Sequence, residues 1–101
     1  MYLVHVTLRA PTPGHRPPPG LAALIRSLSG PADRIEHVCF HPAASPGPVV
    51  GVYLIADCLP AAEEGAVALC LRAVSTLPQM RGWTMTRAGV PLLAPRYGPP
   101  G

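Results

Sequence analysis

The stretch from Val49 to Leu77, VVGVYLIADCLPAAEEGAVALCLRAVSTL, predicts a buried strand that leads through a turn into the longest helical pattern of the chain. Side chains alternate along a strand, so residues 49–56 present apolar groups to both faces. A strand that is apolar on both faces belongs in the middle of a sheet, covered on both sides. The rest of the chain is therefore expected to pack around this strand.

The helix of this stretch is expected from Pro60 to Leu77. Proline suits the first helical turn, where its missing N–H costs nothing. Glu63 and Glu64 follow in that turn, where negative charge complements the helix dipole. An apolar stripe at helical spacing predicts one core-facing side. Its members are Ala66, Cys70, Ala73, Val74 and Leu77.

The remaining patterns give three more strands and one more helix. Strands are expected at 2–9, 34–41 and 83–88. A helix is expected to begin at Leu21 and to end before Gly30, with a stripe of Leu21, Leu24, Ile25 and Leu28. Gly30 is the expected residue after the helix end, because glycine tolerates the left-handed conformation there. Residues 10–20, APTPGHRPPPG, form a Pro/Gly loop that neither pairs in a sheet nor forms a helix.

The order strand, helix, strand, strand, helix, strand is the ferredoxin-like βαββαβ pattern. It predicts an α+β fold with a four-stranded antiparallel sheet and two helices on one face. The expected spatial order is last, first, third, second strand. We expect one domain over residues 1–94 and a disordered Pro/Gly tail over 95–101.

Composition narrows the class of protein. The chain has 101 residues, of which 49% are hydrophobic, which is enough to form a single hydrophobic core. Its apolar runs are too short for a membrane span. No signal-peptide pattern opens the chain, and the three cysteines match no disulfide or CxxC pattern, so a cytoplasmic protein with reduced thiols is expected. All eight basic residues are arginine, and there are 15 prolines and 10 glycines, a bias typical of a high-GC bacterial genome. The arginines are scattered and aromatics are few, so neither nucleic acid nor membrane is an expected partner.

The sheet face opposite the helices is too apolar to stay in water. It is expected to carry Leu3, His5, Thr7, Ile35, His37, Cys39, His41, Val49, Tyr53 and Ile55, joined by Thr84 and Thr86. A small two-layer domain has no third layer to cover such a face. The simplest solution is a homodimer, sheet against sheet, in which Thr7, Ile35, His37, Cys39 and Ile55 are the expected binding residues.

Over residues 2–88 this element order resembles the dimeric α/β-barrel superfamily, whose members join two βαββαβ units through their sheets. The resemblance is one of pattern, and no catalytic motif of the superfamily is present to carry over. It implies a dimer and a function drawn from a mixed set. That set holds cofactor-independent monooxygenases, isomerases and cyclases, and members without known activity, and the fold does not choose among them.

Two sets of side chains on the open face could carry chemistry. His5 and Tyr53 are the candidate catalytic pair for acid–base work on a small apolar substrate, or else an ordinary strand histidine and a packing aromatic. His37, Cys39 and His41 share one face, but residues i and i+4 of a strand lie about 13 Å apart. One ion would take only an i, i+2 pair, so we expect no metal and no other cofactor.

The leading hypothesis is therefore a small accessory or binding protein, homodimeric through its open sheet, that serves a bacterial biosynthetic pathway. Its ligand would be a small apolar molecule or a partner protein. The alternative is a dimeric α/β-barrel enzyme that acts on an apolar metabolite in the dimer cleft. A weaker alternative is a metal-binding regulator that uses His37, Cys39 or His41.

Overall fold

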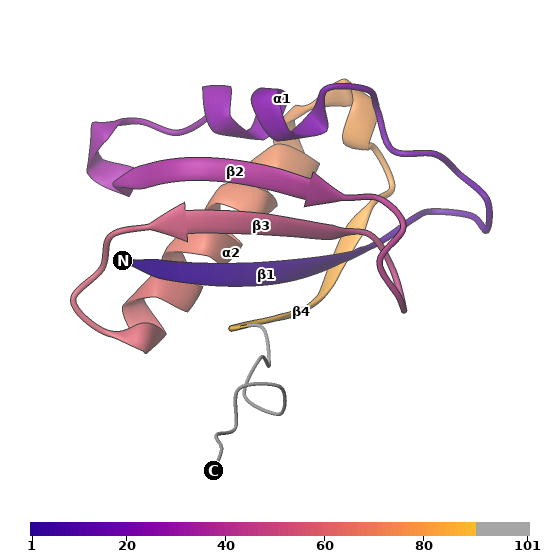
Figure 1. Cartoon of the computed structure of the whole chain (residues 1–101). Coiled ribbons are helices and arrows are strands. Elements are labelled where there is room, and N and C mark those ends of the chain that lie inside the picture. The colour runs from indigo at the N-terminus through magenta and orange to yellow at the C-terminus, as the bar shows by residue number, and fades with distance from the viewer. Residues whose placement is uncertain (91–101) are drawn as a thin grey trace, which may run out of the picture.

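The computed structural model describes residues 1–90, and it has the predicted order of elements. The elements are β1 (Tyr2–Arg9), α1 (Leu21–Ser27), the 3-10 turn η1 (Pro31–Asp33), β2 (Ile35–His41), β3 (Val49–Leu54), α2 (Leu59–Thr76), the 3-10 turn η2 (Pro78–Met80) and β4 (Thr84–Gly89). The strands form one antiparallel sheet in the order β2-β3-β1-β4. This confirms the ferredoxin-like α+β fold, with β1 and β3 in the centre of the sheet (Figure 1). Residues 91–94 of the predicted domain and the predicted tail 95–101 lie outside the described residues.

The core lies between the sheet and the two helices, which cover the same face (Figure 1). Val4 and Val6 of β1 and Val50 and Val52 of β3 are fully buried there, because alternate residues of both central strands point toward the helices. The predicted stripe of α2 packs against them, led by the buried Ala66, Cys70 and Ala73. Burial raises the pKa of the Cys70 thiol to about 12, so this cysteine is an inert core residue.

The helix ends differ from the predicted ones. α2 begins at Leu59, one residue before Pro60, and its first turn holds no acidic residue, so the predicted role of Glu63 and Glu64 in that turn was wrong. α1 ends at Ser27, and Gly30 opens η1 instead of following the helix. None of the helices within residues 1–90 is both long and apolar enough to span a bilayer.

One ion pair ties η1 to α2. The Arg72 guanidinium donates to the carbonyl of Leu28 at 2.7 Å and to the Asp33 carboxylate at 3.2 and 3.3 Å. The hydrogen bond from Arg72 is the main reason that the pKa of Asp33 is lowered, followed by the bond from the Gly30 amide. The connection from α1 to β2 is thereby fastened to the longer helix.

A bulge in β2 moves one predicted face residue into the core. Ile35 pairs with Leu54 and His37 pairs with Tyr53, so Glu36 is an extra residue in the strand. Ile35 consequently packs against the core cluster, and its predicted place on the open face was wrong. A one-residue shift exchanges the two faces of a strand, and the alternation of the sequence does not reveal where that shift occurs.

The core assignment predicts different costs for two adjacent leucine-sized side chains of α1. Ile25 is 1% exposed, whereas Leu24, a member of the predicted stripe, is half-buried and outside the core cluster. Ile25→Ala should lower the free energy of unfolding by about 2–5 kcal/mol, and Leu24→Ala by much less. Urea unfolding of both variants checks this, and equal losses would contradict the packing of α1.

Candidate functional site

The open face of the sheet is ordered in three rows that run across β1, β3 and β2. The middle row contains His5, Gly51 and Cys39. The rows on either side contain Leu3, Tyr53 and His37, and Thr7, Val49 and His41. Both helices lie on the other side of the sheet, so no element within residues 1–90 covers these rows (Figure 1). The imidazoles and the thiol are thereby held on strands, on the face of the sheet that the two helices leave open.

Gly51 creates the space in which the middle row assembles. A Cβ atom at position 51 would lie 2.6 Å from Cys39 Sγ and 3.6 Å from His5 Cδ2, so the thiol occupies the volume that a side chain would need. Cys39 Sγ lies 3.6 Å from His41 Nε2, and the His5 and His41 ring centroids are 5.7 Å apart. His5, Cys39 and His41 therefore gather around the backbone of Gly51. Strand alternation had placed all three side chains on the open face, and the glycine in the middle of an apolar strand is the sequence feature that brings them together.

The predicted pair of His5 and Tyr53 is divided between two rows. Tyr53 packs beside His37, with ring centroids 5.8 Å apart, and His5 packs beside His41 at 5.7 Å. An open hollow of about 320 Å³ lies at the Tyr53–His37 pair. Its lining consists of Met1, Glu36, His37, Cys39 and Tyr53. His5 does not line this hollow, and its ring partner is His41 instead of the expected Tyr53.

The other predicted binding residues occupy different environments. Thr7 is only 7% exposed, whereas Ile55, which follows β3, is 38% exposed. Thr84 pairs with Arg9 at the start of β4, and the Thr86 hydroxyl donates to the carbonyl of Thr7 at 3.4 Å. Thr7 thus lies beneath the surface and Ile55 on it.

Burial, followed by repulsion from His41, lowers the pKa of His5 below its ordinary value of 6.5. His5 is therefore a neutral imidazole at neutral pH, able to donate one hydrogen bond and accept another. Within residues 1–90, no group of three or more His, Cys, Asp or Glu side chains is placed so as to hold a metal ion.

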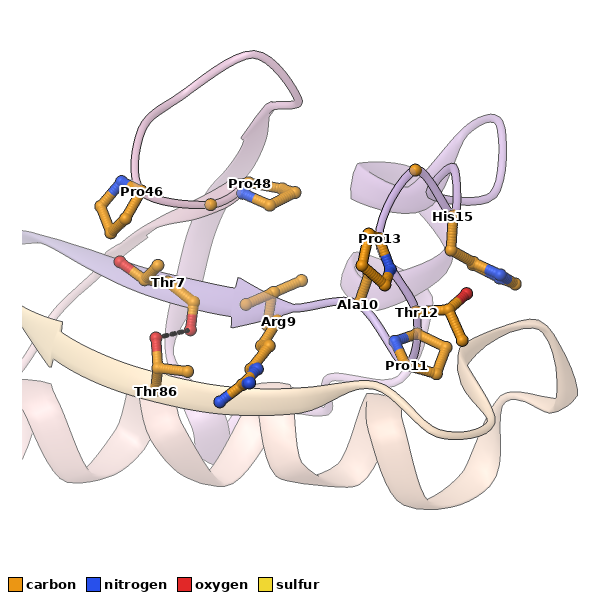
Figure 2. A pocket seen from close by; sticks show the side chains of 13 residues that line it. Thr7, Arg9, Ala10, Pro11, Thr12, Pro13, His15, Pro46, Pro48 and Thr86 are labelled. Atoms are coloured by element: carbon orange, nitrogen blue, oxygen red, sulfur yellow. Dashed lines mark hydrogen bonds between the residues drawn. The ribbon is translucent and has the colours of Figure 1, made fainter.

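A second hollow, of about 570 Å³, lies at the end of the sheet where β1 leaves it (Figure 2). Its lining comprises residues 7–15, residues 46–48 and Thr86. The Leu8 amide donates to the carbonyl of Pro48 at 2.8 Å, which fixes the β2–β3 loop against β1. On the other side, His15 and the buried Trp83 form a T-shaped ring pair with centroids 5.9 Å apart, which holds the Pro-rich loop in place. The sequence indicated these two segments only as loops, because it does not show that they face one another.

Comparison with known proteins gives no relative for this chain: no family model, no curated protein and no solved structure matches it. The open face and the two hollows are therefore the features from which a function can be inferred.

The packing of the middle row predicts that the effect of Gly51→Ala on the free energy of unfolding depends on the Cys39 thiol. Gly51→Ala should destabilise the protein by about 1–3 kcal/mol, because the new methyl group needs the space of the Cys39 thiol. In a Cys39→Ala background that space is empty, and the same substitution should be neutral or stabilising, since alanine restricts the unfolded chain more than glycine does. Unfolding of the two single variants and the double variant measures the coupling. Strictly additive effects would show that the thiol does not occupy the Gly51 site.

The lowered pKa of His5 predicts a loss of stability in acid. The unfolded chain takes up the proton at the ordinary pKa of 6.5 before the folded chain does. The contribution of His5 is therefore complete above 6.5 and is lost as the pH falls through the lower, folded-state pKa. When the pH is lowered from above 6.5 to below the folded-state pKa of His5, the free energy of unfolding should fall more for wild type than for His5→Gln. An identical pH dependence of the two proteins would contradict the shift.

Proposed function

We propose that this protein is a small accessory or binding protein that acts as a homodimer through its open sheet face. The observation that carries the proposal is the one-sided covering of the sheet. Both helices lie on one face, while the other presents three rows of ordered side chains with no covering element within residues 1–90. An exposed, largely apolar sheet face is a surface on which proteins associate.

A second copy of the chain suits this face because its charged side chains belong to the two edge strands, Glu36 to β2 and Arg87 to β4. Its three rows contain no Asp, Glu, Arg or Lys. Two copies therefore meet without burying an unpaired carboxylate or guanidinium, which would be costly. A two-fold interface needs only a surface that complements itself. Exposed apolar groups such as Ile55 and the half-buried Leu3 and Tyr53 then leave water together.

The arrangement of the histidines favours binding over the alternative enzyme. An acid–base pair needs its two groups within hydrogen-bonding reach of one substrate position. His5 and Tyr53 belong to separate ring pairs, and the hollow beside Tyr53 does not include His5. The accessory role in a bacterial biosynthetic pathway follows from the composition and from the resemblance to the dimeric α/β barrels.

The dimer is tested by a charge on the open face. Ile55→Asp should convert a wild-type dimer into a folded monomer, because the interface would have to desolvate an unpaired carboxylate. Leu71→Asp is the matched control, since Leu71 is 51% exposed on α2, in the layer on the opposite side of the sheet. Sedimentation of the three proteins at micromolar concentration gives the answer. A folded wild-type monomer, or equal dissociation by both variants, would refute the interface.

A further inference from the structure

We propose that the hollow at the end of the sheet is a binding site for a small carboxylate whose body is apolar. The site goes beyond the proposed dimer, because its lining comes entirely from one chain. Its volume of about 570 Å³ lies in the range of small-molecule sites, which extends from about 300 to 1,000 Å³. Arg9 is one of the lining residues, and Figure 2 shows its side chain leaving β1 and running across β4, the strand that carries Thr86.

The walls are apolar and stiff. Pro11 and Pro13 stand on one side of the hollow, and Pro46 and Pro48 on the other (Figure 2). Each proline ring fixes its own backbone angle, so the segments lose little conformational freedom when a ligand binds. Gly47 allows the closest approach, because a Cβ atom there would lie 2.5 Å from the carbonyl oxygen of Leu8. The walls are thus set in place before any ligand arrives.

The polar groups of the lining suit one anionic group. Arg9 is exposed and forms no ion pair within residues 1–90, so its guanidinium is available to a ligand. A guanidinium binds a carboxylate through two parallel hydrogen bonds, which fixes orientation as well as charge. The hydroxyl groups of Thr7, Thr12 and Thr86 and the imidazole of His15 supply further donors and acceptors. The lining contains no Asp or Glu.

Acidic residues are segregated along the sheet in the direction that favours an anion here. The chain has five acidic residues, and all lie toward the opposite end of the sheet or in the half of α2 that begins there. They are Asp33, Glu36, Asp57, Glu63 and Glu64. Arg9, Arg16 and Arg81 belong to the hollow's end, the last because Gly82 packs on Pro11. Charges of one sign around a concave site raise the local concentration of the opposite ion.

The balance of one guanidinium and four proline rings defines the ligand class. A phosphate or nucleotide carries more than one negative charge and is usually held by several cations or by backbone amides at a helix end. The hollow offers a single lining guanidinium and a large apolar wall. A monocarboxylate with a ring-containing hydrocarbon body matches both features.

The experiment uses 2-naphthoate as the probe and 2-naphthamide as its neutral counterpart of the same shape. In calorimetric titrations, wild type should bind naphthoate at least about tenfold more tightly than the amide, because only the carboxylate pairs with Arg9. Arg9→Gln should remove that difference. Arg9→Lys should retain part of it, since lysine keeps the positive charge but cannot donate two parallel hydrogen bonds to the carboxylate. Arg26→Gln, at an exposed site in the last turn of α1, is the matched control and should bind as wild type does.

Amide NMR shifts locate the site and separate it from the dimer. Naphthoate should shift residues 7–15, 46–48 and 86, and the Ile55→Asp variant should bind it as wild type does, because one chain forms the hollow. Equal binding of naphthoate and naphthamide, equal losses in the Arg9 and Arg26 variants, or shifts elsewhere would overturn the site. Tighter binding of inorganic phosphate than of naphthoate would overturn the ligand class.

Discussion

The structure depends on a central strand, β3, that has apolar neighbours on both faces but helices on only one. On the helix side, Val50, Val52 and Leu54 are buried in the core. On the other side, Val49 is 8% exposed and Gly51 is buried, although no element of residues 1–90 lies above them. Side chains from β1 and β2 give this partial cover, with Leu3, His5 and Cys39 closing over the glycine. The open face is therefore a shaped surface of mixed imidazole, thiol and hydrocarbon.

Position 51 shows how a residue without a side chain organises its neighbours. In a central strand, glycine loses packing area and costs conformational entropy. Here the lost area is regained by Cys39 Sγ, which fills the site from the adjacent strand and lies within 3.6 Å of His41 Nε2. A larger residue at 51 would separate His5 of β1 from Cys39 and His41 of β2, the two strands that flank β3. The cluster of His5, Cys39 and His41 is thus a consequence of packing in the sheet.

The sequence predicted the elements and their order well because strand and helix periods differ strongly in this chain. It also predicted the central position of β1 and β3 from their apolar character, and the helix-facing valines from alternation. It failed where one residue changes the register. The extra residue Glu36 turns Ile35 into the core, and β4 shifts between the partners of Thr7 and Leu8. Single bulges of this kind leave no mark in a pattern of apolar residues.

The sequence predicts the open face of the sheet much better than it predicts the hollow at the end of the sheet. The open face follows from alternation along strands, so most of its residues were found, although their pairing was not. The end hollow joins the Pro-rich loop to the β2–β3 loop, and their approach depends on tertiary contacts such as Leu8 to Pro48 and His15 to Trp83.

Thr7 belongs to both sites: it shares a row with Val49 and His41, and it lines the hollow. Because Thr7 is 7% exposed, the two sites adjoin through a buried residue instead of sharing one open cleft. In the proposed dimer, a single chain would offer the three rows of its open face to a second copy, and the end of the sheet that carries Arg9 would remain accessible to a small anion.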